Sequence, residues 1–227
     1  KSKPKDACLE QIQLLEKARE ERRRSMNERR EKRAALEKKY AAQGTPGDVD
    51  FQKMIQDFRN SCSVGNKHDV TGGVNSPVKI CIVIRKRPIN AKEIRKKDYD
   101  SVTCIHPFVM VHDCKLKVDG ITKYLDNTDF AFDHTFDEYD TSEDLYKYTT
   151  SPLIPFIFEK QGKATCFAYG QTGSGKTYTM TKIQAMAIRD IFTLLQSNPA
   201  YNDLCVFVSF FEIYGGLCQD LLNNRHR

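Results

Sequence analysis

The chain has 227 residues, enough for one sizeable hydrophobic core and an extension, and 40% of them are hydrophobic and 29% charged. No apolar run is long enough to span a membrane and no signal peptide is expected, while eight scattered cysteines without a C-x-x-C pair favour buried, reduced thiols over disulfides or a metal site. The net charge of +6 lies in one segment, residues 17–39, which suggests an acidic partner.

Residues 9–40 predict one long helix, because Ala, Leu, Glu, Lys and Arg dominate and neither Gly nor Pro interrupts them. Apolar residues are too sparse for a heptad repeat, so this basic helix is either a solvated spacer or docked on a charged partner. Asp50 is then expected to cap a short helix. The apolar face of that helix should dock on the globular part, and it consists of Phe51, Met54, Ile55 and Phe58. Residues 61–77 contain three glycines and a proline and are expected to be a linker.

The globular part is expected to begin at Val78. An Asp119-Gly120 pair predicts a hairpin turn, and helices are predicted from Ser142, from Lys176 and over residues 184–196. Strands are predicted at 78–84, 102–105, 108–111, 130–132, 164–169 and 204–214. Because strands and helices alternate through the second half, the predicted fold class is α/β.

A phosphate-binding loop follows the predicted strand at 164–169. Its motif, G-x-x-x-x-G-K-[ST], is spelled by Gly170, Gln171, Thr172, Gly173, Ser174, Gly175, Lys176 and Thr177. Glycines let the backbone wrap closely around phosphates, and the following helix presents its positive end to them. Lys176 would reach the β- and γ-phosphates and Thr177 would bind Mg²⁺. No N-K-x-D motif for guanine is present, and Glu212, an acid behind an apolar run, carries little weight as a catalytic group.

The residues around this loop carry a resemblance. The string from Phe167 to Met180 resembles the P-loop of kinesin motor domains. Two more blocks agree in the same order: Arg85-Lys86-Arg87-Pro88 resembles the family's R-x-R-P element, and residues 211–214 with 220–222 resemble its F-E-I-Y-N…D-L-L segment. Gly215 stands where the family usually has Asn.

A narrower resemblance concerns the predicted hairpin. Lys117-Val118-Asp119 is similar to the K-V-D finger of kinesin-13, the internal-motor class that depolymerises microtubules. The residues on either side of this tripeptide and the run Gly162–Cys166 are also similar to that class. The basic helix precedes the motor as a kinesin-13 neck does. The resemblance therefore implies a neck over residues 1–60, a linker over 61–77 and a motor domain over 78–227.

The resemblance implies specific roles. Arg85, Pro88 and Tyr178 would flank the adenine of ATP or ADP, while residues 170–177 hold the phosphates and Mg²⁺. The finger residues Lys117, Val118 and Asp119 would press on tubulin near the interface within its dimer and favour a curved protofilament. Attraction between the basic helix and acidic tubulin would speed their encounter. The expected location is the cytoplasm, on microtubules of the spindle, centromere or centrosome, with neither membrane nor nucleic acid as partner.

Two alternatives remain open at this stage. The basic helix could make the protein a tubulin-binding module that needs no nucleotide. Alternatively, the chain could be a P-loop ATPase stimulated by nucleic acid, with Arg22-Arg23-Arg24 on phosphates, although the basic region lacks interleaved aromatic residues.

The sequence departs from the family in two places. Neither the switch I string N-x-x-S-S-R-S-H nor the switch II string D-L-A-G-x-E occurs, and the loop usual after Met180 is short. Because the switches sense the γ-phosphate and position water, no catalytic residue is assigned. We therefore expect the 227-residue chain alone to show negligible microtubule-stimulated ATPase activity in a phosphate-release assay. A robust stimulated rate would contradict this expectation.

Overall fold

The computed structural model describes residues 4–62 and 80–225, which divide into two units. One unit holds the residues up to Thr149 together with Gly170–Gly175, and the other holds Thr150–Tyr169 and Lys176–Arg227. The predicted linker, apart from Ser61 and Cys62, lies outside the described residues. In the described part of the chain, no helix is both long and apolar enough to cross a bilayer.

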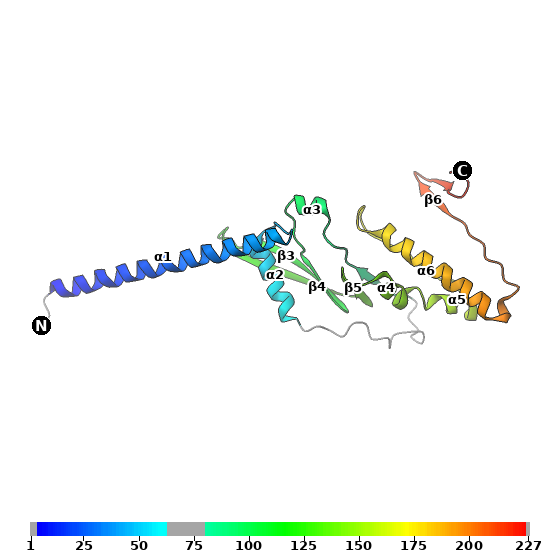
Figure 1. The fold of residues 1–227 in the computed structure, drawn as a ribbon, viewed down its shortest axis with the longest axis horizontal. Helices are drawn as coiled ribbons and strands as arrows, with labels where there is room; N and C mark the ends of the chain where they lie inside the picture. Colours follow the sequence, from blue (N-terminus) through cyan, green and yellow to red (C-terminus); the bar gives the residue numbers. More distant parts are fainter. Residues whose placement is uncertain (1–3, 63–79, 226–227) are drawn as a thin grey trace. The chain divides into compact units, whose positions relative to one another are not determined.

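The first unit begins with the basic helix, α1 (Pro4–Ala42), which is longer than predicted and continuous (Figure 1). Exposed ion pairs one turn apart, Arg24–Glu28 at 3.3 Å and Arg33–Glu37 at 3.2 Å, contribute a few tenths of a kcal/mol each, about 0.3–0.5. Gly44, with φ of 75°, ends the helix in the left-handed conformation that glycine adopts without strain.

The next helix, α2 (Val49–Ser61), is capped by Asp48 and not by Asp50 as predicted. The Asp48 carboxylate accepts hydrogen bonds from the amides of Asp50 at 3.0 Å and Phe51 at 3.2 Å. Asp50 already lies inside the first turn, where its side chain cannot reach these amides. The predicted apolar face is confirmed at Phe51 and Ile55, which are buried, and the Phe58 ring meets the edge of His112 with centroids 4.9 Å apart.

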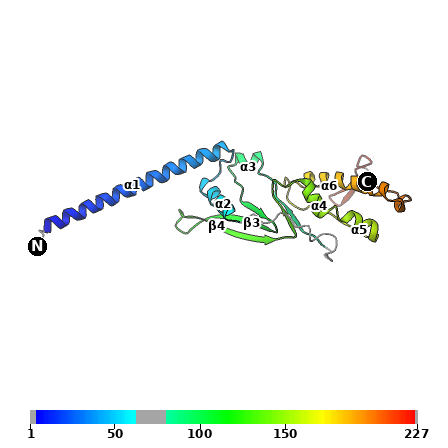
Figure 2. The same cartoon turned by 60° about the horizontal axis from the view of Figure 1, so that its bottom comes forward.

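Two small sheets follow in this unit. Strands β2 (Val102–Ile105), β3 (Phe108–Leu116) and β4 (Lys123–Ala131) form an antiparallel sheet, in which Leu116 pairs with Lys123 beside the turn. Strand β1 (Val83–Arg85) pairs in parallel with β5 (His134–Phe136). The short helix α3 (Ala91–Arg95) and helix α4 (Ser142–Thr149) complete the unit. Helix α2 packs on β4, and Figures 1 and 2 both show it alongside the β3–β4 hairpin.

A small core forms where these elements meet. Phe136 is fully buried, and Leu145 and Tyr146 of α4 are nearly so. Beneath α2, His112 is 2% exposed and is held between Thr103 Oγ1 at 2.8 Å and Asn127 Oδ1 at 2.7 Å. These hydrogen bonds satisfy the imidazole in the sheet, as a buried polar group requires.

Two clusters of charged side chains fasten α2 to the rest of this unit, and we call them the clamp. In the first, Lys123 Nζ of β4 lies 2.6 Å from Asp48 and 2.7 Å from Asp50, and Arg33 of α1 lies 3.6 Å from Asp50. Burial opposes the charge on Lys123, but its hydrogen bonds with both carboxylates outweigh burial and raise its pKa. Burial likewise acts to raise the pKa of Asp48, and Lys123 together with two backbone amides lowers it overall.

The second cluster of the clamp connects α2 to strand β2 and to Lys86, the residue that follows β1. Arg59 donates to Thr103 Oγ1 at 2.9 Å, to the carbonyl of Val102 at 2.9 Å and to the carboxylate of Asp100 at 2.8 Å. Asp100 also accepts from Lys86 at 2.6 Å, and Lys86 in turn pairs with Glu138 at 2.8 Å. The side chain of Lys86 is only 11% exposed, so it depends on both carboxylates to replace the water it has lost.

The second unit contains α5 (Leu153–Lys160), α6 (Lys176–Ser197), a 3₁₀ turn η2 (Pro199–Tyr201) and a hairpin of β6 (Phe211–Tyr214) and β7 (Leu217–Asp220). The rings of Phe158 and Tyr201 approach to 5.1 Å. The helices predicted from Lys176 and over 184–196 are one continuous helix, α6.

Three predicted strands need correction. Residues 164–169 form no strand, the strand predicted at 204–214 is confined to 211–214, and the one predicted at 78–84 is seen at 83–85. An apolar run becomes a strand only when a neighbour accepts its backbone hydrogen bonds, and no described strand pairs with residues 164–169 or 204–210. The prediction of buried thiols is also wrong for the described cysteines. Four are exposed and three are half-buried: Cys81, Cys166, Cys205 and Cys218, and Cys62, Cys104 and Cys114.

The clamp predicts a stability difference between two lysines that each bridge two aspartates. Replacing Lys123 with Met leaves Asp48 and Asp50 unpaired and close together, and should lower the free energy of unfolding by about 1–3 kcal/mol. Lys115 bridges Asp113 and Asp126 on the exposed face of the hairpin, so Lys115→Met should cost clearly less. Urea unfolding of both variants measures the difference. Equal losses would show that the first cluster does not hold α2.

Candidate functional site

The phosphate-binding motif folds as a loop that passes directly into a helix. Gly173 and Gly175 have φ of 84° and 96°, a conformation that residues other than glycine rarely adopt. The backbone of the loop therefore requires glycine at these two positions of the motif. Within the loop the Ser174 amide donates to the carbonyl of Gln171 at 3.1 Å. A Cβ atom on Gly170 would lie 2.6 Å from Ser174 Oγ, so this position has no room for a larger residue unless Ser174 moves.

Helix α6 begins at Lys176, the motif's lysine (Figure 1). A helix of 22 residues has backbone amides without helical partners and the positive end of its dipole at its N-terminus, where Lys176 lies. Lys176 is half-buried and Thr177 is exposed in the first turn. A glycine loop followed by a helix that starts with a lysine and a hydroxyl is the order of residues that binds nucleotide phosphates and Mg²⁺, and this role stays a prediction here.

The residues predicted to flank adenine lie on separate elements. Arg85 ends β1, and its Nη2 donates to Ser142 Oγ at 3.2 Å. Pro88 is exposed beyond the strand, and Tyr178, 62% exposed, lies in the first turn of α6. Because Arg85 and Pro88 belong to the first unit and Tyr178 to the second, their convergence on adenine remains a prediction.

The other two residues of the R-x-R-P element have structural partners. Arg87 pairs with Glu93 of α3, with Nη1 2.9 Å from Oε2, and this contact together with the Asn90 amide lowers the pKa of Glu93 to about 2. Lys86 belongs to the clamp. The sequence did not indicate the partners of Lys86, because they are 14 and 52 positions away from it.

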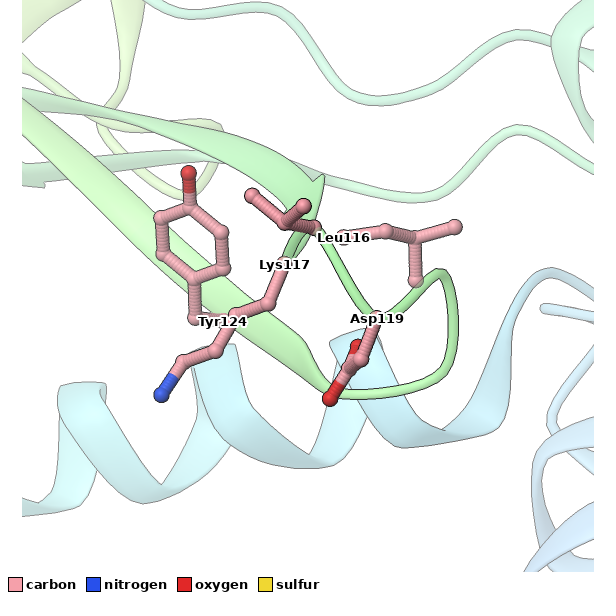
Figure 3. A pocket seen from close by; sticks show the side chains of 5 residues that line it. Leu116, Lys117, Asp119 and Tyr124 are labelled. Atoms are coloured by element: carbon pink, nitrogen blue, oxygen red, sulfur yellow. The ribbon is translucent and has the colours of Figure 1, made fainter.

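The predicted tubulin-binding finger is the turn between β3 and β4. Lys117, Val118 and Asp119 line a shallow depression with Leu116 and Tyr124 (Figure 3). Val118 is fully exposed. At the base of the turn the Lys117 amide donates to the carbonyl of Thr122 at 2.8 Å. The hairpin turn predicted from Asp119-Gly120 is therefore confirmed, and the three residues lie together at its end.

Glu212, the acid behind an apolar run, lies on β6. Its Oε1 is 3.2 Å from Nη1 of Arg225, and its side chain is 37% exposed. An exposed, ion-paired carboxylate has no feature of a catalytic base, so the structure adds no support for that role.

The chain is similar to known proteins in both sequence and structure. Residues 85–227 match the family model described as Kinesin motor domain. "Diatom spindle kinesin-1" from Cylindrotheca fusiformis is 44% identical over 225 residues, which cover 98% of this chain and 36% of that protein. The chain thus spans little more than a third of the curated relative's length.

A solved structure is also similar, "KIF14[391-772] dimer two-heads-bound state - AMP-PNP in complex with a microtubule". It is 28% identical, with a TM-score of 0.48, over 64% of this chain and 41% of that chain. The family match confirms the predicted fold class, the α/β fold of a P-loop motor domain.

The loop geometry predicts how nucleotide affinity depends on the motif's lysine. Lys176→Ala removes a charge-assisted contact to phosphate and should weaken binding of Mg²⁺–ATP by about ten- to a hundredfold. Lys182→Ala is the matched control, because Lys182 is exposed on the same helix and outside the motif. Titration of the complete protein with a fluorescent ATP analogue measures both. Equal affinities in the two variants would exclude the loop as the phosphate site.

Proposed function

We propose, since this chain belongs to the kinesin motor domain family, that it is the neck and part of the motor of an ATP-dependent kinesin that removes tubulin from microtubule ends. In this proposal residues 1–60 are the neck, 61–77 the linker and 78–227 the motor region. The protein would act on the microtubule cytoskeleton, and the name of its diatom relative, a spindle kinesin, favours the spindle.

The observation that carries the depolymerising activity is the β3–β4 hairpin. Each strand has nine residues, their register is unbroken from Phe108–Ala131 to Leu116–Lys123, and the finger lies at the outer end. One face of the hairpin packs under α2, which stiffens it. A stiff projection with a cation and an exposed apolar side chain at its tip can press against a curved surface more readily than a flexible loop can.

The basic helix supplies the second support. All of its side chains described between Gln11 and Lys39 are exposed or half-buried, and the segment 17–39 carries the excess positive charge of the protein. Tubulin is acidic, so α1 would raise the rate of encounter and hold the motor near the lattice, an effect that salt weakens.

The P-loop supplies the third. Loop residues 170–175 would enclose the phosphates with backbone amides, Lys176 would neutralise them, and Thr177 would hold Mg²⁺. ATP supplies the free energy that separates the motor from released tubulin. Arg85, Pro88 and Tyr178 would position the base, so that the triphosphate enters the loop in one orientation.

A second candidate function is tubulin binding through α1 without nucleotide. The length and exposure of this basic helix favour it, because its side chains from Gln11 to Lys39 are exposed or half-buried while Arg33 pairs with Asp50 of α2. This candidate predicts that affinity for the microtubule lattice is the same with and without ATP and is unchanged by substitutions in the finger.

The test is a triple substitution in the complete protein, Lys117→Ala, Val118→Ala and Asp119→Ala. We expect depolymerisation of stabilised microtubules to be lost while co-sedimentation with the lattice persists, because α1 and the nucleotide loop are untouched. Lys96→Ala with Lys97→Ala, in the exposed turn after α3, is the matched control and should depolymerise normally. Depolymerisation that survives the triple substitution would refute the role of the finger.

A further inference from the structure

We propose, on the basis of the depolymerising function above, that the tubulin-contacting surface of the finger consists of Lys117, Val118 and Ile121. Asp119 is then a positioning residue that holds the turn and does not contact tubulin. This division of roles differs from the one that the tripeptide suggests, because it removes one motif residue from the contact surface and adds one outside the motif.

The carboxylate of Asp119 is turned back onto its own loop. Oδ1 accepts from the amides of Ile121 at 2.9 Å and Thr122 at 2.8 Å, and Oδ2 accepts from the hydroxyl of Thr122. Figure 3 shows this carboxylate lying against the returning strand. Both oxygens are therefore engaged within four consecutive residues, and contact with a partner would have to compete with these hydrogen bonds.

The backbone of the turn matches this arrangement. The Gly120 amide donates to the carbonyl of Lys117 at 2.9 Å, and Gly120 has φ of 67°, which a side chain would strain. With the Lys117–Thr122 hydrogen bond at its base, the turn has one closed conformation. Among the described residues, the side-chain hydrogen bonds within segment 117–122 are all accepted by the Asp119 carboxylate, so its loss should open the tip.

Closing the turn projects two apolar side chains outward. Val118 is fully exposed and Ile121 is 82% exposed, while neighbouring Leu116 is 52% exposed. Lys117, also exposed, adds a positive charge beside them. Burying a large aliphatic side chain against a partner is favourable, because it removes apolar surface from water. A valine and an isoleucine at one tip form a small apolar knob with a cation at its side.

The occupant of this knob is tubulin, by continuity with the finger. An acidic protein surface that offers an apolar recess beside a carboxylate is complementary to Val118 and Ile121 with Lys117. Nothing in this complementarity calls for a carboxylate from the motor, and a negative group at the contact would oppose attraction to an acidic partner.

The experiment compares four variants of the complete protein. Asp119→Asn keeps an oxygen that accepts the two amide hydrogen bonds, so it should retain most of the depolymerisation rate. Asp119→Ala removes them and should lower the rate by about tenfold or more. Ile121→Ser should lower it by a similar factor without opening the turn, whereas Ile121→Leu keeps the apolar contact and should retain most of the rate.

Hydrogen exchange supplies a readout that is independent of tubulin. Amides of Ile121 and Thr122 should exchange faster in Asp119→Ala than in Asp119→Asn, and unchanged exchange in Asp119→Ala would overturn the positioning role. A loss of depolymerisation in Asp119→Asn as large as in Asp119→Ala would show that the charge contacts tubulin. A normal rate in Ile121→Ser would remove Ile121 from the contact surface. If the unmodified protein fails to depolymerise microtubules, the proposed function fails, and exchange still decides the role of Asp119.

Discussion

The clamp on α2 is the constraint on which the arrangement of the first unit depends. Lys123 stands between Asp48 and Asp50, and Asp50 also faces Arg33 near the end of the basic helix. One cluster of charges therefore joins α1, α2 and β4. Lys123 is the least exposed of these groups and depends most on its partners, whereas the Arg33–Asp50 pair is exposed and contributes less. The cluster therefore holds α2 on β4 more firmly than it holds α1.

The same lysine connects the clamp with the finger. Lys123 follows Thr122, whose amide and hydroxyl hold the Asp119 carboxylate and whose carbonyl closes the turn. The base of the finger is thus fixed by long-range ion pairs and its tip by local hydrogen bonds. A projection that presses on a partner needs both a rigid base and a rigid tip. If either were flexible, the finger would bend and would not transmit force to the partner.

The features predicted correctly from sequence were local ones. The polar helix, the apolar face at Phe51 and Ile55, the turn at Asp119-Gly120 and the glycine loop followed by a helix at Lys176 each depend on residues within a few positions of one another. The misplaced cap of α2 is a local error, whereas the omitted contacts involve residues far apart in the sequence. The cap was displaced by two residues because Asp48 and Asp50 are both plausible cap residues, and only the backbone decides between them. The contacts of Arg59 and Lys123 span 41 to 75 residues and have no periodic signal.

The R-x-R-P element and the clamp share Lys86, and this shared residue restrains both. Lys86 lies between Arg85 and Arg87 in the R-x-R-P element, and Asp100 binds both Lys86 and Arg59 of α2. Moving the element away from Asp100 would leave a lysine with 11% exposure short of a partner, and a carboxylate that Arg59 alone must balance. This cost and the Arg87–Glu93 pair oppose displacement of the backbone after β1 relative to α2. Within the described residues, the ion pairs that oppose it run from Lys86 through Asp100 to Arg59 of α2.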